Sequence, residues 1–219
     1  MRKNNKYHGF NDLDCKLEKY IDYDSGFYVE LGANNGVNQS NTYYFETYKN
    51  WRGILIEPVL HNYFQCKQIR SPENKFFCNA CVSFAYTEEF VPLMYSNLMT
   101  TTLHVESDIP SPRQHAEMGR RFLSENEDII LFGAKARTLN DILLEAEAPQ
   151  QIDLLSLDVE GAEIEVLKGL DFKQFRFKYM CIECRDIDTM KSFLNERGYE
   201  PVAHLADIDY LFAPCASHS

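Results

Sequence analysis

The stretch Phe27-Tyr-Val-Glu-Leu-Gly-Ala-Asn-Asn-Gly36 decides which fold we expect for this chain. Its first five residues have the pattern of a short buried strand, which breaks at Gly32. Gly32 permits a tight turn, and Gly36 allows close approach to a ligand and close packing of the helix that follows. We expect that helix to begin near Ser40 or Asn41, because both residue types are favoured at an N-cap. This order predicts the start of a doubly wound α/β fold.

A second buried strand, at residues 53–57, ends in the acidic residue Glu57. A carboxylate at this distance from the glycine turn can accept hydrogen bonds from both ribose hydroxyls of an adenosyl group. Glu30 ends the first strand, where its charge would repel a pyrophosphate but suits the cationic amine of S-adenosylmethionine. The two carboxylates therefore favour S-adenosylmethionine over a dinucleotide, although Glu30 also fits a solvated or helix-paired acid.

Strands and helices alternate along most of the chain, which predicts a mainly parallel sheet. We expect further strands at residues 76–83, 90–95, 152–157, 179–183, 201–205 and 210–213, and helices near 12–22, 58–69, 114–123, 161–170, 187–197 and from Thr138 onward. The last two strands are joined too tightly for a helical crossover, so we expect them to be antiparallel. The irregular pattern over residues 96–137 is typical of a lid or a binding loop.

Carboxylates gather after the strand at residues 152–157, in the string Leu157-Asp-Val-Glu-Gly-Ala-Glu163. In an open α/β sheet, ligands bind at the carboxyl edge of the strands. Close carboxylates spread their pKa values apart, which suits acid and base chemistry. Asp158 and Glu160 are therefore candidate catalytic residues, and Glu183 joins them because it ends the next strand at the same edge.

His104 is a further candidate base, because it lies in the irregular segment and could reach down over the site. Asp158 and Glu183 are also candidate oxygen ligands for Mg²⁺. The sequence does not choose between a metal-assisted and a metal-free reaction.

Composition argues against several classes of partner. The net charge of −11 is a poor match for a nucleic acid, whose binding rests on basic contacts to phosphate. No apolar run approaches the ~20 residues of a membrane-spanning helix. Residues 1–6 are basic but no apolar segment follows them, so we expect no signal peptide and a cytoplasmic protein. The cysteine pairs 78/81 and 181/184 then fit small buried thiols in strands better than zinc ligands.

Six strings of this sequence together resemble the FkbM-type methyltransferases. They are Tyr28-Val-Glu-Leu-Gly-Ala-Asn-Asn-Gly36, Ser40-Asn-Thr42, Trp51-Arg-Gly-Ile-Leu-Ile-Glu-Pro58, Asn79-Ala80, Thr138-Leu-Asn-Asp141 and Ile152-Asp-Leu-Leu-Ser-Leu-Asp-Val-Glu-Gly-Ala-Glu163. The resemblance covers residues 10–213. It implies a single Rossmann-like class I methyltransferase domain over residues 1–219, with a seven-stranded sheet, an antiparallel last strand and helices on both faces. Residues 1–25 are then an N-terminal helical extension, and residues 84–137 are an insert that forms a substrate-binding loop or lid.

The resemblance also implies O-methylation, with S-adenosylmethionine as methyl donor, of a hydroxyl on a sugar, a nucleotide-sugar, a glycan or a natural product. By the family pattern, the cofactor-binding residues are Glu30, Gly32, Ala33, Asn34, Gly36, Ser40, Glu57, Pro58, Asn79, Ala80 and Asp158. The chain departs from the commonest pattern at Asn34-Asn35, where a second acidic residue often stands. It departs again at Asn140, where many members carry Asp. The insert does not match the family pattern, so the acceptor stays open.

Other classes of function stay in view. A non-catalytic nucleoside-binding module could use the same Rossmann-like fold. An oxidoreductase is disfavoured because the chain lacks a full G-x-G-x-x-G and a suitably placed Tyr-x-x-x-Lys. A nucleic-acid methyltransferase is disfavoured by the acidic charge and by the lack of an Asp/Asn-Pro-Pro-Tyr/Phe string. The sequence leaves the oligomeric state open, a homodimer included.

Overall fold

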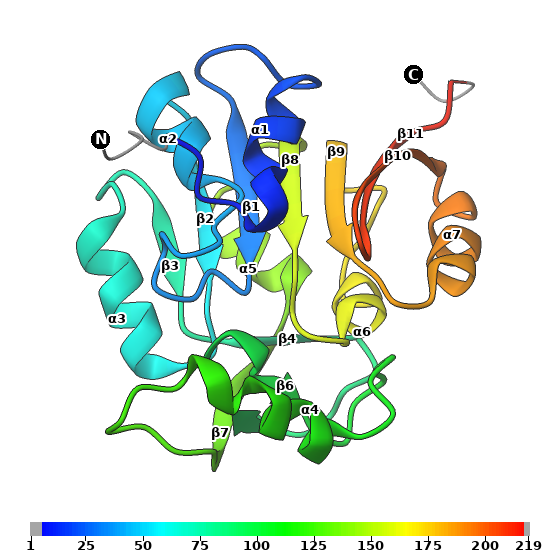
Figure 1. Ribbon diagram of the computed structural model, residues 1–219. Coiled ribbons are helices and arrows are strands. Elements are labelled where there is room, and N and C mark those ends of the chain that lie inside the picture. The colour runs from blue at the N-terminus through cyan, green and yellow to red at the C-terminus, as the bar shows by residue number, and fades with distance from the viewer. Residues whose placement is uncertain (1–5, 217–219) are drawn as a thin grey trace.

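Seven strands form the main sheet of the protein, for which a computed structural model describes residues 6–216 (Figure 1). In their order across the sheet they are β10 (Tyr199–Ala206), β11 (Asp209–Pro214), β9 (Arg176–Glu183), β8 (Gln151–Leu157), β1 (Phe27–Leu31), β2 (Arg52–Ile56) and β3 (Lys75–Phe77). Neighbouring strands are parallel except at β11, which is antiparallel to both β9 and β10. The predicted mainly parallel sheet with an antiparallel last strand is therefore confirmed. The first five residues of the predicted N-terminal extension lie outside the described residues.

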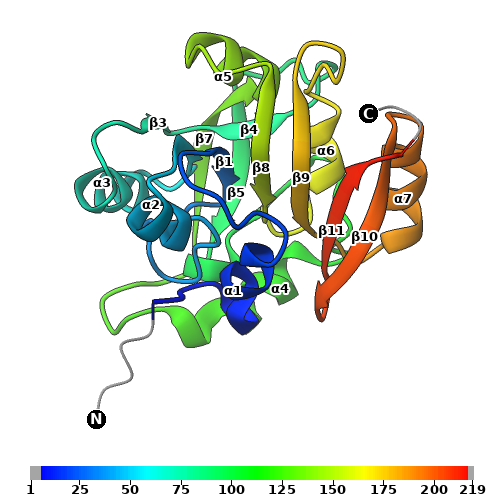
Figure 2. The same ribbon diagram turned by 90° about the horizontal axis from the view of Figure 1, so that it is seen from above.

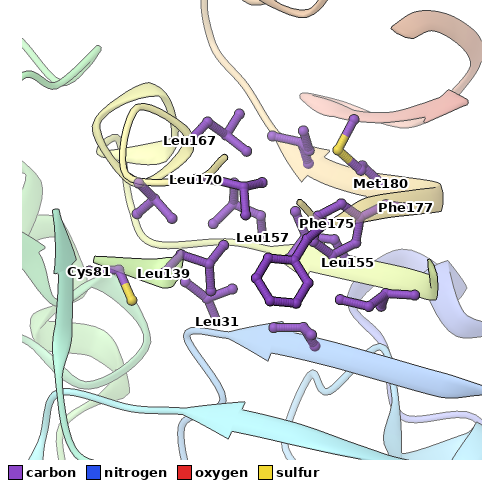
Figure 3. Packing of buried hydrophobic residues seen from close by; sticks show 14 of the residues in the cluster. Leu31, Cys81, Leu139, Leu155, Leu157, Leu167, Leu170, Phe175, Phe177 and Met180 are labelled. Carbon is purple, nitrogen blue, oxygen red and sulfur yellow. The ribbon is translucent and has the colours of Figure 1, made fainter. Parts of the chain in front are cut away.

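Helices cover both faces of this sheet (Figure 2). One layer holds α1 (Leu13–Glu18), α2 (Tyr43–Lys49) and α3 (Leu60–Ile69), and the opposite layer holds α5 (Leu139–Glu145), α6 (Glu163–Leu167) and α7 (Ile187–Asn195). The alternation of side chains along β1 supplies both layers, because Tyr28 packs with the first and Leu31 with the second. Figure 3 shows part of the second core, to which β1 contributes Leu31, β8 contributes Leu157 and α6 contributes Leu167. This packing fixes the ends of β1 and β8, where the predicted site residues follow.

A second, smaller sheet goes beyond the sequence-based prediction. It consists, in order, of β4 (Ala80–Val82), β7 (Ile130–Thr138), β5 (Phe90–Tyr95) and β6 (Thr101–Thr102). Two predictions are therefore wrong. The expected strand at 76–83 is divided between β3 and β4, because Asn79 Nδ2 donates to the carbonyl oxygen of Lys135 at 3.0 Å and the chain leaves the main sheet there. The expected irregular segment contains the strand β7, which is defined by pairing on both sides and not by a buried face.

The segment between β5 and β7, with α4 (Pro112–Gly119), lies against the carboxyl ends of the main strands (Figure 1). Thr101 Oγ1 donates to the carbonyl oxygen of Glu160 at 2.9 Å, and the Asp108 N–H donates to the carbonyl oxygen of Gly161 at 2.9 Å. We call residues 84–137 the cap. These hydrogen bonds hold it on the edge of the sheet where the predicted site lies.

Of the paired cysteines, Cys81, Cys181 and Cys184 are buried as expected, whereas Cys78 is half-buried and lies between β3 and β4. All seven are free thiols. Cys181 packs in the core beneath α1, α2 and α3, whereas Cys184 packs in the opposite core. Their side chains therefore point to opposite faces of the sheet and do not converge on one metal ion. Among the described residues, none of the helices is long and apolar enough to cross a membrane.

Candidate active site

A cavity of about 390 Å³ lies at the carboxyl edge of the main sheet, beneath the cap. Its size is that of a small-molecule site. Ten of the residues predicted from the sequence line it, namely Gly32, Asn34, Ser40, Glu57, Pro58, Asn79, Ala80, Asp158, Glu160 and Glu183. The other four, Glu30, Ala33, Gly36 and His104, are not among its lining residues. The cap adds wall residues that were not predicted, among them Asn97, Met99 and Thr102.

The turn after β1 forms one wall of the cavity and requires glycine. Gly32 has a φ of +77°, and a Cβ atom there would lie 1.8 Å from the carbonyl oxygen of Asp158. The Gly32 N–H donates to the carbonyl oxygen of Ile56 at 3.1 Å, and the Asn34 N–H donates to Glu57 Oε2 at 2.8 Å. The turn and Glu57 therefore meet because β1 and β2 are neighbours that end at the same edge.

Glu57 is buried and keeps room for further hydrogen bonds. Its Oε1 accepts from the Val59 N–H at 2.9 Å and its Oε2 accepts from the Asn34 N–H at 2.8 Å. Burial raises the pKa of Glu57 to about 7. A carboxylate offers about four acceptor positions. The carboxylate therefore keeps acceptor capacity for further donors, which suits the neighbouring hydroxyls of a ribose.

Glu30 is engaged by the protein and not by the cavity. Its carboxylate lies 3.2 Å from Arg70 Nη1, and both side chains are almost fully buried. It also accepts hydrogen bonds from three groups of the loop before α2: Ser40 Oγ at 2.9 Å, Asn41 N–H at 3.1 Å and Thr42 Oγ1 at 2.6 Å. This is the helix-paired acid that the sequence left open, so we assign Glu30 to the organisation of that loop.

Gly36 and Ala33 contribute to packing. Gly36 has a φ of +84°, and a Cβ atom there would lie 2.9 Å from both Arg70 Cγ and Cys66 Sγ. Gly36 therefore packs closely against α3 and its C-terminal end, and not against α2, the helix that directly follows the turn. Ala33 is buried in the core between α1, α2 and α3 and the sheet.

Three neighbouring strands each bring a carboxylate to the same edge. Asp158 follows β8, Glu183 ends β9, and Asp209 begins the antiparallel strand β11 directly opposite Glu183. All three line the cavity, and we call them the acid row. Carboxylate oxygens of Asp158, Glu160 and Glu183 lie within 4.8 Å of one another.

Loss of solvent and the closeness of the carboxyl groups in the acid row raise their pKa values, so that protonated forms are favoured near neutral pH. Asp158 is exposed to the cavity, but the surrounding protein displaces most of its solvent. This loss of solvent, together with the charge of Glu160, raises the pKa of Asp158 to about 7. Burial and the charge of Asp158 raise the pKa of Glu183 well above its usual range. A carboxyl group with a pKa near 7 is suited to accept a proton at physiological pH.

Arg185 supplies positive charge beside these carboxylates, and it is absent from the sequence-based predictions. Its Nη2 lies 2.9 Å from Glu160 Oε2 and 3.2 Å from Glu183 Oε1, and its Nη1 lies 3.5 Å from Asp108 Oδ1 of the cap. Its position just beyond the end of β9 is the signal that could have identified it. Because the guanidinium already bridges Glu160 and Glu183, Mg²⁺ at this place would have to bind beside a fixed positive charge.

The cap brings a histidine to the carboxylates, but it is His115 and not His104. His104 is exposed and lies outside the lining of the cavity. His115 is buried on α4, and its Nε2 lies 2.8 Å from Glu160 Oε2. His115 therefore lies against Glu160 from the cap, without a hydrogen bond between the two side chains, whereas His104 is not among the residues that line the cavity.

Two buried polar atoms of the cavity wall, Asn41 Oδ1 and Thr102 Oγ1, have no hydrogen-bond partner among the described residues. The Asn41 amide is oriented by its Nδ2, which donates to Ser156 Oγ at 3.1 Å. Buried polar atoms in native proteins are normally paired. Both atoms are therefore suited to polar groups of a bound molecule.

The sequence matches the family model described as the methyltransferase FkbM domain over residues 30–201, a range that includes the cap. The comparison with curated proteins found no match. Among solved structures, this chain is similar to a protein of Pyrococcus horikoshii described as a candidate RNA methyltransferase, with 10% sequence identity and a TM-score of 0.43. That alignment covers 95% of this chain and 82% of the other.

Proposed function

The chain belongs to the FkbM methyltransferase family, and we propose that it transfers the methyl group of S-adenosylmethionine to a hydroxyl of a sugar, a glycan or a natural product. The proposal that the acceptor is a hydroxyl rests on Asp158. This residue lies at the sheet edge where ligands bind, and its pKa is about 7. An alcohol is a very weak acid, so its methylation needs a base beside the reacting oxygen.

The part of the cavity around Glu57 fits the adenosyl group. We assign the free acceptor positions of Glu57 to the ribose hydroxyls and the wall at Asn79 and Ala80 to the adenine. The methionine end then lies against Gly32 and Asn34, two of the cofactor-binding residues that the family pattern implies. The unpaired Asn41 Oδ1 is suited to the cationic amine, the role that Glu30 would otherwise have.

The chain's own residues would then orient the acceptor and hold its proton. S-adenosylmethionine supplies a methyl group on a sulfonium sulfur, which leaves with the bonding electrons as a neutral thioether. Ionised Asp158 accepts the proton of the acceptor hydroxyl. Arg185 holds Glu160 beside it. The cap covers the cavity and limits the access of water.

The first test is the affinity for S-adenosylhomocysteine, measured by calorimetric titration. Glu57→Ala should weaken binding by about 1–3 kcal/mol, or about 5- to 150-fold in Kd, because the ribose hydroxyls lose a charged acceptor. Glu73→Ala removes an exposed carboxylate and should leave Kd unchanged. An unchanged Kd in a folded Glu57 variant would remove Glu57 from the site. A folded wild-type protein that binds no S-adenosylhomocysteine would refute the proposed function and favour a non-catalytic module.

Removal of divalent cations should leave the reaction intact. Arg185 already bridges Glu160 and Glu183, so a second cation is not needed to offset their charge. We expect S-adenosylhomocysteine production in excess EDTA to equal that in added Mg²⁺. A loss of turnover in EDTA that Mg²⁺ restores would instead assign Asp158 and Glu183 to a metal site.

A further inference from the structure

The acid row contains a pair of facing acidic residues that the fold does not require. Glu183 and Asp209 are directly opposite each other on β9 and β11. Two acidic residues at such positions destabilise an antiparallel pair, by charge repulsion when both are ionised and by the cost of a buried carboxyl group when one is protonated. Asp158 stands on the other side of Glu183 and adds a third carboxyl group. An apolar or oppositely charged residue at one of these places would give a more stable sheet, so their presence indicates a function at this edge.

Asp209 differs from the other buried acids of the described chain. It is 7% exposed and lines the cavity. The other buried carboxylates, at Asp14, Glu30, Glu57, Glu163 and Glu165, all accept hydrogen bonds from the protein. Within residues 6–216, no group donates a hydrogen bond to the Asp209 carboxylate or forms an ion pair with it. Asp209 is therefore a buried acceptor that faces the cavity without a partner.

Positive groups near Asp209 are already engaged elsewhere. Arg185 bonds to Glu160 and Glu183. Lys16 Nζ donates to the carbonyl oxygen of Leu205 at 2.7 Å. A further acid, Asp207, also lines this end of the cavity. Ionised Asp209 consequently has no counter-charge of its own, and a bound cation would supply one and would also favour the ionised form of Glu183.

We propose that the acceptor carries a protonated amine next to the hydroxyl that is methylated, as an amino sugar or an amino alcohol does. The amine binds between Asp209 and Glu183, while Asp158 takes the hydroxyl proton. This inference rests on the proposed function. An ammonium group has three donors, and its hydrogen bonds to carboxylates are about twice as strong as neutral ones. A neutral polyol would leave ionised Asp209 without a counter-charge, and a phosphate or carboxylate would be repelled by it.

Matched acceptors test this assignment with the full chain and S-adenosylmethionine. Glucosamine and glucuronate each differ from glucose at one substituent, and an amino alcohol, a diol and a hydroxy acid of the same length form a second set. S-adenosylhomocysteine formed is the readout. We expect kcat/KM to be about 10- to 100-fold higher for the amine member than for the neutral member of a set. The acidic member should be the poorest.

Asp209→Asn separates recognition of the amine from the chemical step. The variant should raise KM for the amine about 10- to 100-fold and change KM for the neutral acceptor far less, so that the preference for the amine is lost. Asp188→Asn, an exposed carboxylate on α7, is the matched control and should change neither. If Asp209→Asn does not fold, the ratio of kcat/KM for the amine acceptor to kcat/KM for the neutral acceptor in the wild-type protein tests the amine assignment alone.

A kcat/KM for neutral or acidic acceptors equal to or higher than that for the amine would overturn the amine assignment. A result in which the amine member of neither set is methylated would also overturn it. Stimulation of neutral acceptors by Mg²⁺ would also overturn it, because the acid row would then hold a metal ion. S-adenosylhomocysteine titration of the same preparation reports separately on the proposed function. Binding of S-adenosylhomocysteine without amine preference therefore refutes only the further inference.

Discussion

Asp158→Asn is expected to lower turnover by about 10²- to 10⁴-fold, the usual contribution of a positioned general base. The amide keeps the size of the side chain but cannot take up the hydroxyl proton. Asp158 stands at the end of β8 beside Glu160 and Glu183, where an acceptor hydroxyl and the base would meet. S-adenosylhomocysteine release with a saturating acceptor from the matched sets is the measurement. Calorimetric titration should show nearly unchanged affinity for S-adenosylhomocysteine.

The role of Asp158 as a base also predicts how the activity changes with pH. Below its pKa of about 7, Asp158 is protonated and cannot act as a base. The kcat/KM of the wild-type protein should therefore rise with pH and level off above about 7. The residual activity of Asp158→Asn should lack this rise, whereas Asp188→Asn should retain it. Near-normal turnover in Asp158→Asn would move the role of the base to Glu183.

The main sheet is predictable from the sequence because its strands are buried on both faces. Residues 27–31 and 152–157 are apolar runs bounded by turn residues, and the helices between them restrict the strand order. β7 lacks that signal. Most of its side chains are at least partly exposed, Gly133 and Lys135 interrupt its apolar residues, and its position depends on pairing with β4 and β5. Such long-range pairing leaves no periodic pattern to read.

Some residues of the site were likewise predictable from the sequence, and others were not. Glu57, Asp158 and Glu183 were predictable because each stands where a parallel strand ends. Asp209 reaches the same edge from the opposite direction, since β11 is antiparallel and begins there. The predicted antiparallel hairpin contained that signal. The pairing of Glu30 with Arg70 was not predictable, because 40 residues separate them and only the packing of α3 brings them together.

Arg70→Met should lower the free energy of unfolding by about 3–5 kcal/mol, a large part of the stability of an ordinary domain. Arg70 is 2% exposed, and its guanidinium pairs with Glu30 and Glu46. Its Nη1 also donates to the carbonyl oxygen of Gly36 at 2.9 Å. Methionine would fill the space but leave two carboxylates buried without their counter-charge. Urea denaturation at pH 7, with the midpoint and slope fitted together, measures the loss.

A double variant distinguishes charge from packing as the cause of this loss. Addition of Glu46→Gln to Arg70→Met removes one uncompensated charge, so part of the lost stability should return. Arg52→Met changes an exposed arginine in β2 and should stay within about 0.5 kcal/mol of wild type. If Arg70→Met is as stable as this control, the ion pairs do not hold the loop before α2. If it is destabilised, the affinity for S-adenosylhomocysteine should fall as well, because Arg70 anchors Gly36 and Ser40 beside the cavity. The same arginine would then link the stability of the fold to the shape of its cofactor site.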